Sequence, residues 1–286
     1  MIEVVAPGAL SLVEDLGRPG VAALGVARSG AFDRGALRLA NRLVGNDERA
    51  AGIEALAGGL ALRAHARVVV AVAGADGPVA VRAGSGSVRV QPRRSPLHLA
   101  PGDVLELGMP ARGLRSYVGV RGGLAAARTL GSASYDSLAR LGPAPLAAGD
   151  RLAAGSATIG DPHVDHAPGR PAEGPLRVIP GPRDDWFGDA GLEALAATEW
   201  AVSSASDRVG VRLEGEALQR IRAGELPSEP MVPGALQVPP DGRPVLLGPD
   251  GPTTGGYPVI GVVVDADLDR VAQLRPGELL RFSIVR

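Results

Sequence analysis

An internal repeat constrains this chain of 286 residues more than any other feature, because it divides the chain into two related halves. Four pairs of segments match at offsets of 174 or 175 residues: 4–8 with 178–181, 33–34 with 207–208, 53–54 with 228–229, and 74–78 with 248–252. The abundance of Gly, Ala and Val could produce single matches by chance, but four matches at nearly one offset favour a duplication.

A stretch rich in proline and glycine marks the predicted boundary between the halves. Residues 155–174 contain no apolar period, which is typical of a linker. We therefore expect an N-terminal domain over residues 1–155, a linker over 156–174 and a C-terminal domain over 175–286.

Composition favours short strands over long helices. The chain contains 41 Gly and 25 Pro but only 3% aromatic residues, so its core depends on Val, Leu, Ile and Ala. Residues 97–107 resemble two strands joined by a turn at 101–103. Helices are expected only over 33–43, with Asp33 as N-cap, over 192–197 and over 214–222. This pattern predicts a mostly β fold with two barrel-like domains and few short helices.

The residue types that are missing exclude several classes of function. The sequence contains no lysine, so the chain cannot form a Walker-type phosphate loop, a Schiff base or a biotinylated carrier. Its net charge of −1 and lack of a basic run give no support for nucleic-acid binding. Cysteine is absent, and no apolar run is long enough to span a membrane. We expect a cytoplasmic protein without a secretion signal.

Asp207 and Arg208 are candidate site residues because they match Asp33 and Arg34 of the first half. An Asp in this position could cap a helix or anchor a loop in either copy. In the second half, Arg208 and Arg212 could instead clamp a carboxylate ligand.

The segment 250–258 is the densest candidate site. Its Thr253 and Thr254 supply hydroxyl groups, and the glycines that follow allow backbone N–H groups to approach a ligand oxygen. A plain turn is the alternative, and the sequence favours neither. The predicted contact residues of this loop are Thr253, Thr254, Gly255, Gly256 and Tyr257.

Three further polar groups allow more than one interpretation. Arg115 and Tyr117 should share one face of a strand, which could line a site inside a barrel, face solvent or lie at a subunit interface. In segment 14–20, an Asp that caps backbone N–H groups and pairs with Arg18 is favoured over an anion site. His163 and His166 lie in the predicted linker, so we expect no metal site there.

Several of these segments together resemble the family of the 5-oxoprolinase C component, also called allophanate hydrolase subunit 2 or the biotin-dependent carboxyltransferase family. The resemblance spans nearly the whole chain in order. It is carried by segments 14–20, 25–33, 40–46, 53–54, 115–117, 122–123, 181–184, 206–208, 228–229, 237–239, 253–258, 265–268, 272–273 and 276–277.

The resemblance implies two cyclophilin-like β-barrel domains and a role in a hetero-oligomer with the A and B components of 5-oxoprolinase. The B component is similar to allophanate hydrolase subunit 1. That complex opens 5-oxoproline to glutamate with ATP, and this chain alone is expected to be inactive. For such a site we expect Asp207, Arg208 and Glu229 as catalytic residues, with Arg115, Tyr117 and the 253–257 loop binding substrate.

Two other functions remain open from the sequence. The first is the carboxyltransferase half of a urea carboxylase type of system with a separate biotin carrier. The second is a non-catalytic regulatory partner of the B component. The chain also departs from the family pattern at Glu14, Ala133 and Pro252, where the family often has Gln, Arg and Gln.

Overall fold

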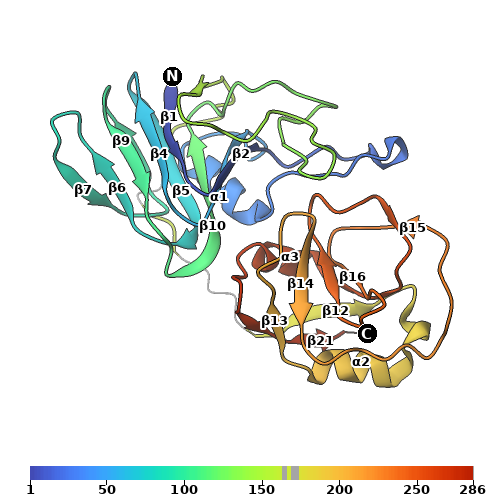
Figure 1. Cartoon of the computed structure of the whole chain (residues 1–286). Helices are drawn as coiled ribbons and strands as arrows, with labels where there is room; N and C mark the ends of the chain where they lie inside the picture. Colours follow the sequence, from blue (N-terminus) through green and yellow to red (C-terminus); the bar gives the residue numbers. More distant parts are fainter. Residues whose placement is uncertain (163–165, 169–173, 286) are drawn as a thin grey trace. The chain divides into compact units, whose positions relative to one another are not determined.

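A computed structural model describes residues 1–162, 166–168 and 174–285 (Figure 1). The chain packs as two compact units. Unit 1 comprises Met1–Arg18, Asp33–Asp136 and Arg140–Arg170, and unit 2 comprises Pro19–Phe32, Ser137–Ala139 and Pro171–Arg286. Much of the predicted linker, residues 163–165 and 169–173, lies outside the described residues.

Unit 1 is built from two antiparallel sheets. One has the strand order β11-β1-β4-β9-β6-β7, and the other has the order β2-β3-β10-β5-β8. The strands are β1 Ile2–Pro7, β2 Leu10–Glu14, β3 Gly52–Leu56, β4 Leu60–Ala64, β5 Val68–Asp76, β6 Val79–Arg82, β7 Val88–Gln91, β8 Pro96–Leu99, β9 Val104–Leu107, β10 Arg112–Val120 and β11 Arg151–Leu152.

The core of unit 1 lies between these sheets. Val4 and Leu62 of the first sheet and Ile53, Val72 and Val118 of the second belong to one buried apolar cluster. Alternate residues of β4 are buried, as expected for strands that present one face to a core. Aliphatic side chains form this core, as the composition predicts.

The helix α1, Arg34–Leu43, covers part of unit 1 and confirms the helix predicted over 33–43. Asp33 is its N-cap, because the side chain accepts a hydrogen bond from the N–H of Ala36 at 2.8 Å. Its apolar face, including Leu37 and Leu43, is buried.

Unit 2 contains one eight-stranded sheet, ordered β20-β13-β14-β17-β16-β19-β12-β21, and a two-stranded sheet of β15 and β18. The strands are β12 Leu176–Pro180, β13 Trp200–Val202, β14 Gly210–Glu214, β15 Glu229–Pro230, β16 Ala235–Gln237, β17 Val245–Leu247, β18 Thr254–Gly255, β19 Val259–Val263, β20 Leu279–Leu280 and β21 Phe282–Ile284. The helices are α2 Gly188–Ala197 and α3 Asp265–Val271, and short 3-10 helices span η1 Ala22–Leu24 and η2 Asp184–Trp186.

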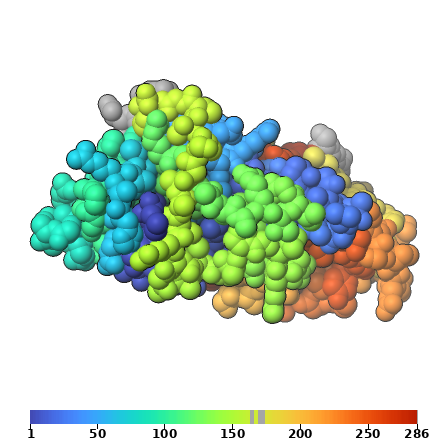
Figure 2. Space-filling view, turned by 90° about the horizontal axis from the view of Figure 1, so that it is seen from above, coloured from blue at the N-terminus to red at the C-terminus, as the bar shows by residue number. Residues whose placement is uncertain are grey.

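Segment 19–32 of the first half is part of unit 2. Phe32 belongs to the same buried cluster as Trp186 and Trp200, and the N–H of Ser29 donates to the carbonyl oxygen of Pro249 at 3.0 Å. In the space-filling view, blue atoms of this segment lie against orange and red atoms of the second half (Figure 2). Segment 137–139 also belongs to this unit.

The mostly β fold class predicted from the sequence is confirmed, and so are the two strands around the turn at 101–103. The helix predicted over 192–197 forms the second part of α2. The predicted helix over 214–222 is wrong. Glu214 ends β14, and the N–H groups of Leu218 and Ile221 donate to the carbonyl oxygens of Gly242 and Trp186 instead of to a helical turn.

Helix α3 had no counterpart among the predicted helices. Its first turn carries Asp265 and Asp267, and acidic residues there interact favourably with the N-terminal end of a helix. This acidic turn is the signal that could have indicated the helix.

Candidate functional site

An accessible ion pair between Arg183 and Glu229 forms the centre of a polar site in unit 2. The Nε of Arg183 lies 2.9 Å from Oε1 and 3.0 Å from Oε2 of Glu229, and its Nη2 also donates to Oε1. The backbone N–H of Arg183 donates to the carbonyl oxygen of Val259 at 3.1 Å, which anchors the residue beside β19. The two side chains are 35% and 21% exposed, so a ligand in solution can reach both.

The two-stranded sheet brings the predicted 253–257 loop beside this ion pair. Glu229 is directly paired with Gly255 in the ladder of β15 and β18. A Cβ at position 255 would lie 2.5 Å from Nε2 of Gln237, so the Gln237 amide lies directly beside this glycine. We define the Glu229 site as Arg183, Glu229, Gln237 and Gly255.

The Glu229 site presents an anionic acceptor next to cationic and neutral donors. Hydrogen bonds from Arg183, aided by its charge, lower the pKa of Glu229 despite partial desolvation of the carboxylate. Glu229 is therefore ionised at neutral pH and can accept a hydrogen bond but not donate one. Thr254 pairs with Pro230 in the same ladder, so its exposed side chain points to the face opposite Glu229. The Glu229 site suits a ligand in which an N–H lies beside a C=O.

Asp250 is fully buried in unit 2 and is surrounded by donors. Arg208 donates from Nε to Oδ2 at 2.9 Å and from Nη2 to Oδ1 at 3.1 Å. The Oγ of Ser29 donates to Oδ1 at 2.6 Å, and Ser137 donates to Oδ2 from its N–H at 3.0 Å and its Oγ at 2.7 Å. We call Ser29, Ser137, Arg208 and Asp250 the Asp250 cluster.

The Asp250 cluster holds an ionised pair away from water. Burial raises the pKa of Asp250, but the charge of Arg208 and hydrogen bonds from Arg208, Ser29 and Ser137 outweigh this effect and lower it overall. Arg208 is itself 3% exposed and also donates to the carbonyl oxygen of Gly30 at 2.7 Å. The guanidinium of Arg208 therefore binds the carboxylate of Asp250 instead of the carboxylate of a ligand.

Asp207 lies at the surface next to this cluster in sequence. Its Oδ1 accepts hydrogen bonds from the N–H groups of Val209 at 2.8 Å and Gly210 at 3.0 Å, closing a turn before β14. Asp33, its match in the repeat, caps a helix instead. The matched aspartates thus both hold backbone N–H groups, but in different local structures.

Arg115 and Tyr117 lie in unit 1 and converge on Glu54, so their predicted common face is confirmed. The Nε of Arg115 is 3.5 Å from Oε1 of Glu54, and the Oη of Tyr117 donates to Oε2 at 2.8 Å. The N–H of Asp33 donates to the same Oη at 2.7 Å. Burial, followed by the charges of Glu54 and Asp33, raises the pKa of Tyr117 well above its ordinary range, so its hydroxyl stays protonated.

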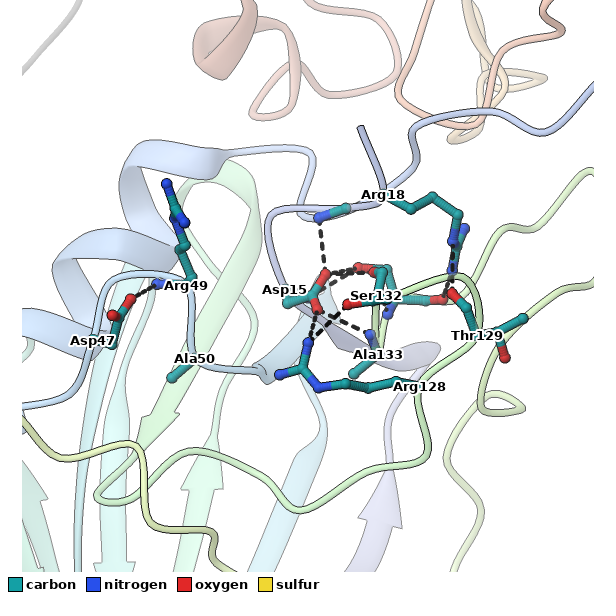
Figure 3. Close-up of polar contacts among 12 residues, drawn as sticks. Asp15, Arg18, Asp47, Arg49, Ala50, Arg128, Thr129, Ser132 and Ala133 are labelled. Carbon is teal, nitrogen blue, oxygen red and sulfur yellow. Dashed lines mark hydrogen bonds and ion pairs between the residues drawn. The ribbon is translucent and has the colours of Figure 1, made fainter. Parts of the chain in front are cut away.

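A second buried aspartate, Asp15, organises two loops of unit 1 (Figure 3). Its Oδ1 accepts hydrogen bonds from the Oγ atoms of Ser132 at 2.6 Å and Ser134 at 2.7 Å, and from the N–H of Gly17 at 2.8 Å. Its Oδ2 accepts from the N–H of Ala133 at 2.9 Å. We call Asp15, Arg18, Arg128, Ser132 and Ser134 the Asp15 cluster.

The arginines of the Asp15 cluster have different roles. Arg18 does not pair with Asp15 as predicted; it donates to the carbonyl oxygens of Thr129, at 3.4 Å, and Ser134. The more exposed Arg128 places Nη1 3.4 Å from Oδ2 of Asp15. The predicted backbone capping by Asp15 is confirmed, whereas the predicted partner was the wrong arginine because loop 128–134 supplies most of the contacts.

The structure brings only some of the predicted site residues together. Glu229 and the 253–257 loop adjoin in unit 2, and Asp250 connects Arg208 to the start of that loop. Arg115 and Tyr117 belong to unit 1.

Sequence reasoning missed Arg183, Gln237 and Asp250 as site residues, although all three lie in or beside motifs already singled out. Ser29 and Ser137 carry no local signal, because their partner Asp250 is 221 and 113 positions away.

The histidines and acidic residues do not form a metal centre in the part of the chain that the structure describes. No group of three or more His, Asp or Glu side chains there could hold a metal ion. His163 lies outside the described residues, and Nδ1 of His166 lies 3.3 Å from the Oγ of Ser95. No helix in the described ranges has the length and apolar character needed to cross a membrane.

A family model, curated relatives and solved structures all match this chain over most of its length. Residues 24–284 match the family described as carboxyltransferase domain, subdomain A and B. The chain is 34% identical to the C component of 5-oxoprolinase from Escherichia coli, covering 99% of this chain and 90% of that protein. The corresponding protein of Haemophilus influenzae is 33% identical, with 100% and 91% covered. The crystal structure of the K. lactis urea amidolyase matches with a TM-score of 0.90 and 29% identity over all of this chain, which spans only 19% of that protein.

Proposed function

We infer the function of this chain from its family: it belongs to the carboxyltransferase domain family, subdomain A and B, and is a relative of the 5-oxoprolinase C component. We propose that it is one subunit of an ATP-dependent 5-oxoprolinase that acts with the A and B components. The similarity to two C components over nearly their whole length supports this proposal. In that reaction, water adds to the lactam carbonyl carbon, the C–N bond breaks, and ATP is hydrolysed to ADP and phosphate.

The Glu229 site carries the substrate part of the proposal. A lactam has an N–H beside a C=O, so the ionised Glu229 would accept a hydrogen bond from the N–H while Arg183 donates to an oxygen atom. The side chains of the ion pair are accessible, and Arg183 holds the carboxylate in a fixed direction. This accessible, oriented acceptor is the observation on which the assignment rests.

The other predicted residues enter the proposal in different ways. Arg208 acts through Asp250 because its guanidinium is buried against that carboxylate. Asp207 stabilises a turn, and a contact with substrate remains a prediction for this exposed residue. Arg115 and Tyr117 likewise remain predicted binding residues, in unit 1.

ATP is assigned to another component of the complex in this proposal. A phosphate site commonly uses the N-terminus of a helix with free N–H groups and a lysine. Each α-helix in the described chain instead begins with a carboxylate nearby: Asp33 at α1, Asp189 at α2 and Asp265 at α3. These negative charges and the absence of lysine do not fit bound phosphates. Use of ATP is the reason to propose a cytoplasmic location.

Reconstitution tests this function directly. The full chain, mixed with the A and B components of the same organism, should release glutamate from 5-oxoproline only when ATP is present. Replacing Glu229→Gln should lower kcat/KM about ten- to hundred-fold, because a charge-assisted hydrogen bond is lost. Glu199→Gln is the matched control, since Glu199 is an exposed glutamate with an Arg partner elsewhere in unit 2. No glutamate from the complete mixture would refute the proposed reaction.

A carboxyltransferase function is the second candidate, favoured by the match to the urea amidolyase structure. The carboxyl group would leave the ring nitrogen of carboxybiotin and form a C–N bond with an amide nitrogen such as that of urea, whose proton passes to biotin. The biotin must be supplied by another protein, because this chain has no lysine to carry it. Labelled carboxyl transfer from a carboxybiotinylated carrier to urea, with no turnover of 5-oxoproline, would establish this alternative.

A further inference from the structure

Asp250 joins three segments that are distant in the sequence. Its side chain is 0% exposed and accepts hydrogen bonds from Ser29, Ser137 and Arg208. Two of these donors come from the first half of the chain, and their segments belong to unit 2. A buried carboxylate with this many donors has one well-defined position, because any displacement would break charge-assisted contacts away from water.

The backbone around Asp250 is fixed as well. Its N–H donates to the carbonyl oxygen of Arg208 at 3.2 Å. A Cβ at Gly248 would lie 2.2 Å from that same oxygen, so only glycine permits the approach. Ser29 has a φ of 53°, a left-handed conformation uncommon for serine, and is held there by bonds from its N–H and Oγ to Pro249 and Asp250.

This fixed point lies at the start of the loop that reaches the Glu229 site. Only residues 251–253 separate Asp250 from β18, and an extended chain gains at most about 3.6 Å per residue. At the far end of this span, the N–H of Met231 donates to the carbonyl oxygen of Thr253 at 2.9 Å. Glu229 then pairs with Gly255 in the two-stranded sheet. Movement of Asp250 would therefore be transmitted over a short segment to Thr254 and Gly255.

We propose that Ser29, Ser137 and Arg208 are positioning residues of the Glu229 site, which act through Asp250 to fix the 253–257 loop. The inference rests on the proposed function, because it gives that loop a role in substrate binding. Two segments of the first half would thus set the geometry of a site whose contacting residues all lie in the second half.

Ser137 provides the cleanest test, because its side chain is only partly buried and can be changed without removing a buried charge. Ser137→Ala removes the Oγ donor, whereas Ser137→Thr keeps it. Hydrogen exchange of residues 251–257 in the full chain should become about ten-fold faster in Ser137→Ala and return close to the original rate in Ser137→Thr. In the reconstituted complex, kcat/KM should fall about ten-fold in the alanine variant and recover with threonine.

Ser132→Ala is the matched control, since it removes a hydroxyl donor to another buried aspartate, Asp15. It should leave exchange of residues 251–257 unchanged even if unit 1 is destabilised. Unchanged exchange of 251–257 in Ser137→Ala, or faster exchange with no change in kcat/KM, would overturn the positioning role while leaving the proposed reaction intact. If the unmodified complex does not turn over 5-oxoproline, the proposed function is wrong. The positioning role then fails too, because it was proposed for a substrate-binding loop. The exchange rates would still show whether Ser137 orders residues 251–257.

Discussion

Asp15 in unit 1 and Asp250 in unit 2 are both buried aspartates that join loops far apart in the sequence, but their donors differ in charge. Asp15 is held by two serine hydroxyls and two backbone N–H groups, with Arg128 at the exposed edge. Asp250 is held by the buried guanidinium of Arg208, with serine donors completing the shell.

The difference in donor charge predicts how strongly a substitution in each cluster destabilises the protein. Neutral donors share the task of stabilising Asp15, so the loss of one leaves the others in place. In the Asp250 cluster two opposite charges neutralise each other away from water, and removal of either leaves an uncompensated charge. Substitutions in the Asp15 cluster should therefore have graded effects, and charge removal in the Asp250 cluster should have large ones.

Arg208→Met should have the largest effect, because it keeps much of the side-chain volume but leaves Asp250 buried without its cationic partner. We expect a loss of about 3–5 kcal/mol in the free energy of unfolding. Trp186 and Trp200 both lie in the core of unit 2, so their fluorescence in a urea titration measures this loss. The control Arg281→Met removes an exposed guanidinium and should change stability by about 0.5 kcal/mol or less. Equal shifts in both variants would contradict the comparison.

Asp15→Asn should have a smaller but measurable effect. One carboxylate oxygen is replaced by an NH2 group that faces donors, so we expect a loss of about 1–3 kcal/mol. The effect should appear as faster hydrogen exchange in loop 128–134, where three of its contacts originate. A loss as large as that of Arg208→Met would show that neutral donors do not buffer the cluster.

Acid should weaken unit 2 through Asp250. The pKa of this carboxyl is lower in the folded protein than in the unfolded chain, so ionised Asp250 stabilises the fold above about pH 4, its ordinary pKa. This contribution is lost as the pH falls from there through the lowered pKa. Urea midpoints followed by tryptophan fluorescence should therefore drop in acid, and Asp250→Asn should show a smaller acid-dependent drop from a lower starting stability. An identical acid slope in both proteins would assign the effect to other carboxylates.

Leu130→Gly should have the smallest effect and the opposite sign. Leu130 lies at the tip of the turn that carries the Asp15 donors, with a φ of 52° and 45% of its surface exposed. Glycine adopts this left-handed conformation without strain, so we expect stabilisation of about 1 kcal/mol. Leu130→Ala keeps the strain and serves as the control. A stabilisation of the alanine variant by the same amount would show that the exposed side chain, rather than the backbone, is responsible.

Local patterns predicted much of this molecule. The helix after Asp33 was predicted because an N-cap and an apolar period occur within a short segment, where the contacts that form them are short-range. The 214–222 segment has a similar period but begins inside a strand, and its N–H groups bond to distant carbonyls. The site residues followed the same rule. Glu229, Arg208 and the 253–257 loop were found from their motifs, while Ser29 and Ser137 could not be found because only loop packing brings them to Asp250.

The sequence by itself determined what the chain cannot do and which family it resembles: without lysine it carries neither biotin nor a phosphate loop, and its ordered motifs predict a relative of the 5-oxoprolinase C component. Tertiary structure alone decided that residues 19–32 and 137–139 of the first half belong to unit 2, and that Arg208 clamps Asp250. The excluded functions follow from which residue types the chain contains, and the motifs follow from the order of neighbouring residues. Both can be read directly from the sequence. A buried ion pair depends instead on distant segments that meet in three dimensions. Water is excluded there, so each charge must be compensated by the opposite charge of the pair.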